Sequence, residues 1–276
     1  SVVAGDAGFV AQVDADKTKT WVNWTDNVVR AGNLGMSLDV DAGDRSRVTV
    51  NISGNDVDAI DGETLAAGVL VDVVVDGDGH IEIGAADNTI TVYDEREDVG
   101  LSINAHVTDD GDVGIWVYNN DVSAYENGVW LNALVDDNGN IVVDVSENTI
   151  FAERSPIDIV AKGADKKKWS GGNIDVYFIG NDVLGNTARM YDHTFGVNID
   201  ILAAHDASLL AADNDVEIRG GSGFSVNAIT GDDSSIEFHR NKIDVWEDGI
   251  AVYVDGDRSR IKVGAHVDGL SGNKIW

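Results

Sequence analysis

The sequence predicts an all-β, single-domain solenoid of about nine coils, with three short strands and 27–33 residues in each coil. Three observations predict it. An asparagine recurs at this interval inside a stretch of alternating apolar and polar residues, and a second, glycine-led stretch lies between successive asparagines. No long stretch has the 3.6-residue period of a helix, so the period of two dominates.

The asparagine phrase supplies two strands of each coil. Examples are "VTVNISGNDVDA" at residues 48–59 and "IVVDVSENTIFA" at 141–152. In this motif apolar residues lie three and five positions before the asparagine, and a β-branched residue lies two positions after it. We expect the asparagine to bend the chain between the strands by adopting the left-handed conformation. Stacked asparagines can also hydrogen-bond from coil to coil, because the amide both donates and accepts. The predicted ladder is Asn27, Asn55, Asn88, Asn120, Asn148, Asn181, Asn214, Asn241 and Asn273.

The glycine-led phrase supplies the third strand. It is written "GMSLDV", "GVWLNA" and "GFSVNA", and Pro156 takes the place of the glycine once, in "PIDIVA". Strands this short are stable only when equivalent strands stack in parallel, ~4.8 Å apart, and bury their inward residues in one column. We expect the solenoid to occupy residues 1–276, to begin and end within a coil, and to carry loop insertions near 162–173 and 185–195.

Together the two phrases resemble the coil of right-handed parallel β-helix proteins, the pectate-lyase-like group with an asparagine ladder. The resemblance covers almost the whole chain and implies that fold. It does not imply one activity, because the fold hosts lyases, hydrolases, epimerases, adhesins and phage spikes.

The composition excludes several classes of protein. The chain has 49 acidic and 19 basic residues, and its net charge of −30 excludes nucleic-acid binding. It has no cysteine and no apolar run of the roughly 20 residues that membrane insertion requires. Of the acidic residues 39 are Asp, which suits turns, and such a surface suits a medium rich in salt or divalent cations. Because the chain starts at Ser1, we expect a processed or excised protein. The lack of cysteine and the acidic surface fit an exported protein, so we expect it to be extracellular or at the cell surface.

A polar row is predicted on the outer face of the glycine-led strands. In the enzymes of the resembling group, the substrate lies along the outer face of one sheet. Here the residues four positions after each glycine point outward, and we expect them to bind Ca²⁺ or sugar, or to form a solvated face. Asp39 and Asp72 are the metal candidates, one coil apart. The ligand-binding candidates are Asn104, Asn132, Asp200, Asn227 and Tyr253.

Asp-rich turns follow the same strands and are a second candidate for Ca²⁺. Their candidate ligands are Asp76, Asp78, Asp136 and Asp255, although Asp-Gly is also an ordinary turn sequence and the twelve-residue EF-hand pattern is absent. Asn23 and Asn51 begin glycosylation sequons at the same position of successive coils.

The sequence contains no complete catalytic set. Polygalacturonases would require Asn-Thr-Asp and His-Gly segments and alginate epimerases Asp-Pro-His, and all three are absent. His193 beside Asp192 is an acid/base pair or a surface pair. We therefore expect a structural or adhesive rod, a filament or cell-surface fibre subunit that assembles head to tail with copies of itself or binds cell-surface glycans. The alternative is a polysaccharide lyase, hydrolase or epimerase, or a carbohydrate-binding protein.

Overall fold

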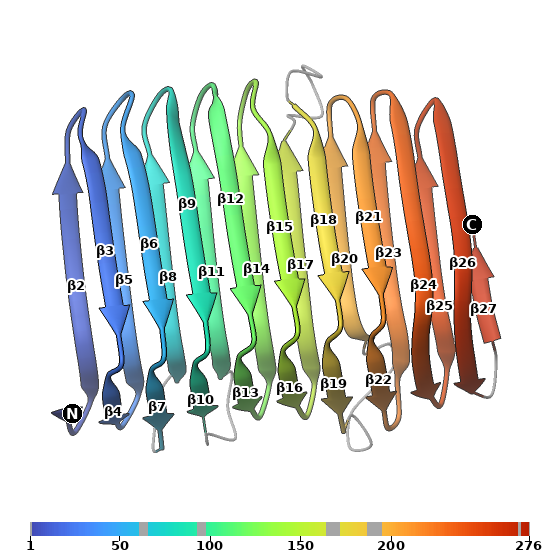
Figure 1. The fold of residues 1–276 in the computed structure, drawn as a ribbon, viewed down its shortest axis with the longest axis horizontal. Coiled ribbons are helices and arrows are strands. Elements are labelled where there is room, and N and C mark those ends of the chain that lie inside the picture. Colours follow the sequence, from blue (N-terminus) through green and yellow to red (C-terminus); the bar gives the residue numbers. More distant parts are fainter. Residues whose placement is uncertain are drawn as a thin grey trace.

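The computed structural model describes residues 2–60, 66–92, 98–163, 172–186, 195–269 and 272–275, with side chains as far as residue 264. These residues form strands joined by turns, and every strand pairing between them is parallel (Figure 1). The predicted all-β parallel solenoid with an asparagine ladder is confirmed. No helix that could span a membrane occurs in the part of the chain that the structure describes.

One side of the solenoid is a 10-stranded sheet made from the glycine-led strands. Its members are β2 (Ala7–Ala15), β5 (Leu34–Ala42), β8 (Ala67–Val75), β11 (Val99–Val107), β14 (Asn127–Val135), β17 (Ser155–Gly163), β20 (Phe195–Ala203), β23 (Ser222–Thr230), β25 (Asp248–Asp255) and β27 (Gly272–Ile275).

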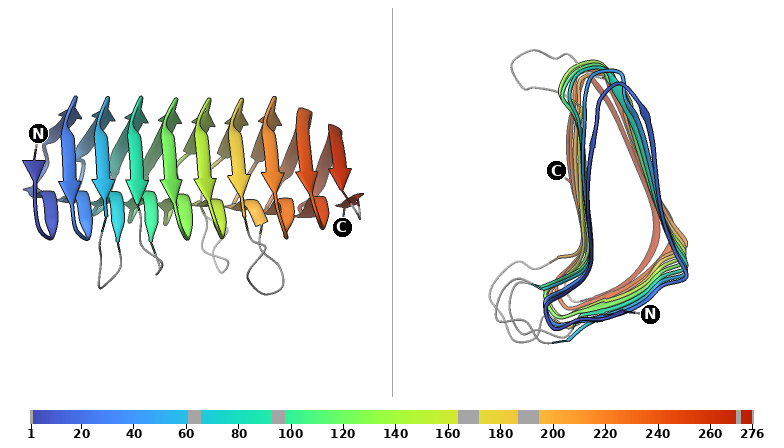
Figure 2. Two further views of the ribbon diagram at one scale, coloured as in Figure 1. Left: turned by 90° about the horizontal axis from the view of Figure 1, so that it is seen from below. Right: turned by 90° about the vertical axis from the view of Figure 1, so that its left-hand side faces the viewer.

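A 17-stranded sheet forms the other two sides, and its strands are of two kinds (Figure 2). The long strands, which precede the ladder or run through its position, are β3 (Lys19–Thr25), β6 (Arg47–Ser53), β9 (Gly79–Ala86), β12 (Gly111–Tyr118), β15 (Ile141–Ser146), β18 (Ile174–Ile179), β21 (Ala207–Ala212), β24 (Asp233–Val245) and β26 (Arg258–Gly269). The short strands are β1 (Val2–Val3), β4 (Val28–Ala31), β7 (Asp56–Ala59), β10 (Thr89–Val92), β13 (Asp121–Ala124), β16 (Thr149–Ala152), β19 (Asp182–Gly185) and β22 (Asp215–Ile218).

The winding is right-handed. In Figure 1 the chain descends through the long strands at the front and ascends through the 10-stranded sheet behind them, while it advances from left to right. This is the hand that crossover connections between parallel strands adopt almost without exception. The two predicted loop insertions lie largely outside the described residues.

The core is one column of inward-pointing Val, Ile, Leu and Ala side chains from all three sides. Near the C-terminal end, three fully buried phenylalanines widen it. Phe178 and Phe238 each meet Phe224 edge to face, with ring centroids 5.8 and 5.4 Å apart. Each buried Val, Leu, Ile or Phe side chain contributes about 1.5–3 kcal/mol, so stacking supplies the stability that a single coil lacks.

The asparagine ladder runs unbroken from Asn27 to Asn241. Each Nδ2 donates to Oδ1 of the next asparagine, over distances from 2.7 to 3.1 Å. The left-handed residue is not the asparagine, as we expected, but the residue before it, for example Asp87 (φ 56°) or Gly54 (φ 64°). The ladder asparagine itself must aim its amide inward, so the neighbouring residue takes the positive φ.

Asn273 was wrongly predicted to belong to the ladder. It lies in β27, which pairs with β25 in the 10-stranded sheet. In the last coil β26 continues past the turn. His239 faces Gly264 and Lys242 faces His266, so the register leaves Ala265 at the ladder position. The interval of 32 residues between Asn241 and Asn273 therefore agrees with the repeat length, although Asn273 does not lie at the ladder position of its coil.

Candidate functional site

The candidate site lies on the outer face of the 10-stranded sheet, where the register aligns the predicted polar row. Asp39 faces Asp72, which faces Asn104, which in turn faces Asn132. After Val160, which is paired with both Asn132 and Asp200, the row continues through Asn227 to Tyr253. The structure thus brings the seven predicted residues of this face into one line, and their role as ligands stays a prediction.

Part of the polar row is internally hydrogen-bonded. Asn104 Nδ2 donates to Asp72 Oδ1 over 2.7 Å, and Asn132 Nδ2 donates to Asn104 Oδ1 over 2.8 Å. These bonds orient both amides along the solenoid axis, so the row presents fixed donors and acceptors to a ligand rather than freely rotating ones.

A second outward row, two positions after each glycine, adds an aromatic ring and a carboxyl group to this face. Trp130 is 48% exposed and is paired with Asp158, which follows Pro156 by two residues. Asp158 is half-buried, and its Oδ1 accepts a hydrogen bond of 3.1 Å from Asn198 Nδ2.

The carboxyl group of Asp158 has a raised pKa. Burial raises the pKa of Asp158 above its ordinary value, the bond from Asn198 opposes this, and the charge of Asp200 raises the pKa further. A carboxyl group with a raised pKa near a second carboxyl group is an arrangement that acid/base chemistry on sugars uses.

Sequence reasoning did not select Trp130 and Asp158 as site residues. The alternation of the strand does place both on the outer face, so that signal was available. The raised pKa of Asp158 depends on burial by neighbouring coils, and a sequence pattern does not show that burial.

The predicted acidic turns do not converge. Asp76 and Asp78 share the turn after β8, whereas Asp136 follows β14 and Asp255 ends β25. Among the described residues there is no group of three or more His, Asp or Glu side chains placed to hold a metal ion. Hydrogen bonds join the turns of neighbouring coils instead, such as Gly77 N–H to Thr108 Oγ1 over 2.9 Å.

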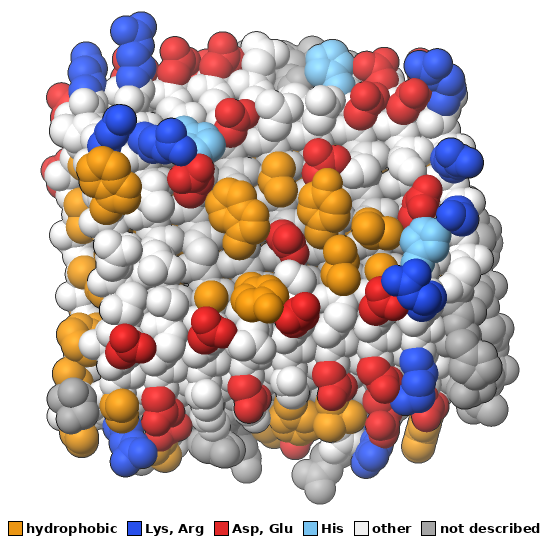
Figure 3. All heavy atoms as spheres, in the orientation of Figure 1, with side chains coloured by type: hydrophobic (Ala, Val, Ile, Leu, Met, Phe, Trp, Pro, Cys, Tyr) orange, Lys and Arg blue, Asp and Glu red, His pale blue; other side chains and the backbone are white. Residues whose placement is uncertain are grey.

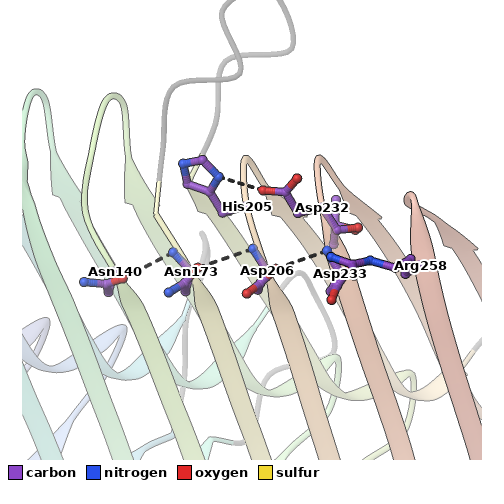
Figure 4. Close-up of polar contacts among 8 residues, drawn as sticks. Asn140, Asn173, His205, Asp206, Asp232, Asp233 and Arg258 are labelled. Carbon is purple, nitrogen blue, oxygen red and sulfur yellow. Dashed lines mark hydrogen bonds and ion pairs between the residues drawn. The ribbon is translucent and has the colours of Figure 1, made fainter.

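A second side-chain ladder runs along the turn into the long strands (Figure 4). The side-chain oxygens of Asn140, Asn173 and Asp206 each accept the backbone N–H of the next coil, over 3.2, 3.3 and 3.1 Å. The ladder ends where Arg258 Nε donates to Asp233 Oδ1 over 2.7 Å. The carboxylates on this corner therefore have a structural role. Beside them His205 Nδ1 lies within hydrogen-bonding distance of Asp232 Oδ2, at 2.9 Å.

The remaining predicted residues are spread elsewhere. Asn23 faces Asn51 on the outer face of the long strands, so the two sequons lie side by side. His193 lies outside the described residues.

A comparison with family models, curated proteins and solved structures found no significant match. The resemblance to the parallel β-helix group therefore rests on the parallel coils and the asparagine ladder.

Proposed function

We propose that this protein is an extracellular structural and adhesive rod that binds polysaccharide along the outer face of its 10-stranded sheet. The observation that carries the proposal is the exposed ring of Trp130 beside rows of Asp and Asn held in register. Sugar hydroxyls both donate and accept, which suits amides and carboxylates, and the apolar face of a pyranose ring suits an aromatic side chain.

The construction of the rod supports this role. Each coil is tied to the next by backbone pairing, by the buried asparagine ladder and by the core column, so outward residues keep their spacing without a ligand. The net charge of −30 suits a medium outside the cell, where cations screen it. Because the edge of a parallel sheet can pair with a strand of another copy, the proposal includes head-to-tail self-association.

The test is affinity electrophoresis through gels that contain galactomannan, hydroxyethylcellulose or polygalacturonate. Trp130→Ala should bind at least about tenfold more weakly than the native chain, because the stacking contact is lost. The matched control is Trp246→Ala, which removes another exposed tryptophan (59%) away from the polar row. Unchanged retardation of Trp130→Ala in every gel would contradict the proposal.

A polysaccharide-active enzyme is the second candidate, and the raised pKa of Asp158 beside Asp200 favours it. In that case the same polysaccharides would be shortened, and Asp158→Asn would abolish the shortening. The activity of a protonated Asp158 would be present at low pH and fall as the pH rises through its pKa, whereas adhesion alone leaves the polymer length unchanged.

A further inference from the structure

The long strands form a different side of the solenoid from the 10-stranded sheet (Figure 2). Their outer face carries a cluster of apolar and aromatic side chains, among them the exposed Trp116 and Tyr118. In Figure 3 hydrophobic side chains gather in the middle of this face around an acidic one. The register identifies the central line, in which Trp116 faces Asp144, Asp144 faces Tyr177 and Tyr177 faces Leu210. We call these four residues and Tyr118 the aromatic platform.

Trp116 lies flat on the sheet. A Cβ atom added to Gly114, two residues earlier in β12, would come within 2.6 Å of Trp116 Cζ3 and 3.0 Å of Cζ2, so the indole covers the glycine backbone. Trp116 is paired with Gly84 of the preceding strand, β9. Glycine weakens a strand and often marks a close approach, and here Gly114 lets the ring lie against the sheet with 40% of Trp116 exposed.

The spacing of the rings fits a repeating polymer. Trp116 and Tyr177 are two strands apart, which is ~10 Å, and Asp144 lies between them. That separation is close to the length of one disaccharide in a β-1,4-linked chain. Alternate sugars could thus stack on the two rings while the sugar between them meets the carboxylate.

Carboxylates supply acceptors on and beside the platform. Ser146 Oγ donates to Asp144 Oδ1 over 2.8 Å, which holds the half-buried carboxylate in place. Tyr118 is 44% exposed, and its hydroxyl donates to Glu147 Oε2 over 2.7 Å. Asp175 lies diagonally across from Asp144, on the next strand. Carboxylates accept hydrogen bonds from neutral hydroxyls and repel polyanions.

We propose that the aromatic platform binds a neutral β-1,4-linked polysaccharide that runs along the solenoid axis. The site is independent of the one proposed on the 10-stranded sheet. A second copy of the chain is a poorer occupant, because a two-fold contact would bring Asp144, Asp175 and Glu147 of both copies together without cations.

The test is calorimetric titration of the native chain with cellohexaose and with mannohexaose. Trp116→Ala should weaken binding of the preferred hexasaccharide at least about tenfold. Trp21→Ala is the matched control, since it removes a 63% exposed tryptophan from an outward position of the same long-strand face, in β3. It should bind as the native chain does. Trp130→Ala should leave this site intact. Comparing Trp116→Ala with the double variant Trp116→Ala/Trp130→Ala in the gels tests the site on the 10-stranded sheet without this one, so the two proposals fail separately.

Gly114→Ala is the second variant. Its methyl group displaces the indole without removing it, so it should weaken binding while the thermal unfolding curve stays close to that of the native chain. Native affinity in both Trp116→Ala and Gly114→Ala, or equal loss in Trp21→Ala, would overturn the proposal. So would sedimentation of the native chain as a dimer that Trp116→Ala dissociates.

Discussion

The ladder asparagines carry more hydrogen bonds per side chain than other described residues of the solenoid turns. Asn148 Nδ2 donates to Asn181 Oδ1 over 3.0 Å and to Val117 O over 2.9 Å. Its Oδ1 accepts both Nδ2 and the backbone N–H of Asn120, each over 2.9 Å. Because Asn148 is 1% exposed, water cannot replace these partners.

We expect Asn148→Ala to lower the free energy of unfolding by about 3 kcal/mol, because it leaves buried donors of Asn120 without an acceptor. The measurement is the midpoint of urea unfolding followed by circular dichroism. The control is Asn138→Ala, since the side chain of Asn138 bonds Asp110 at an exposed turn and should contribute less than about 1 kcal/mol. Equal decreases in the midpoint of urea unfolding for the two variants would show that the buried ladder contributes no more to stability than an exposed hydrogen bond.

At the scale of elements, the glycine-led strands and the short strands fit together closely. A Cβ on Gly100 would lie 2.7 Å from the carbonyl oxygen of Gly128 and even closer to Val122 of β13. Pro156 occupies the glycine position in its own coil, and the short strand beside it has Gly185, where a Cβ would lie 3.2 Å from Pro156 Cγ. The residue paired with Gly185 in the preceding coil is Ala152. Because glycine lacks the methyl group of alanine, Gly185 leaves room for the ring of Pro156.

Gly100→Ala should therefore destabilise the solenoid by about 1–3 kcal/mol, the usual cost of overpacking, since a backbone oxygen cannot move aside. Thermal unfolding measures the effect. Gly84→Ala is the matched control, because the nearest atoms to its added Cβ are 3.9 and 4.0 Å away. We expect no loss of stability there, and a comparable loss in both variants would refute the steric explanation.

For the whole molecule, charge is the dominant feature. The net charge is −30, and many of the described ion pairs join adjacent coils, as in Arg30–Asp58 at 3.1 Å and Lys242–Asp215 at 2.8 Å. In Figure 3 Lys and Arg side chains lie toward the two ends of the rod, while the middle of the face has acidic side chains without them. Copies of the rod must therefore repel one another at low salt.

Self-association should increase with salt. Raising NaCl from about 0.1 M to about 1 M shortens the screening length from ~10 Å to ~3 Å, which removes most of the repulsion between copies. Sedimentation velocity should then show larger species at the higher concentration. CaCl₂ at equal ionic strength, with and without chelator, separates general screening from cation binding by the Asp-rich turns. A single species of constant size under all conditions would exclude head-to-tail assembly.

Particular residues show how far sequence reasoning reached. The eight asparagines from Asn27 to Asn241 were placed correctly, because one phrase repeats around each of them. Asn273 was misplaced, since a repeat interval does not reveal that β26 continues through the turn. The outward line from Asp39 to Tyr253 was predicted from strand alternation alone. The conformation of Trp116 was not, because it depends on how closely the indole packs against Gly114.

The sequence by itself determined that the chain forms parallel coils, which residues point inward and which outward, and how the asparagines stack. These features are periodic, so each repeat states them again. Only the tertiary structure decided that Trp116, Asp144 and Tyr177 form one platform, that Asp158 is half-buried near Asp200, and that no three carboxylates of the described turns are placed to hold a metal ion. Those relations depend on side-chain packing between residues of different coils. Burial by neighbouring coils raises the pKa of Asp158, and packing against Gly114 fixes which face of the Trp116 ring is exposed.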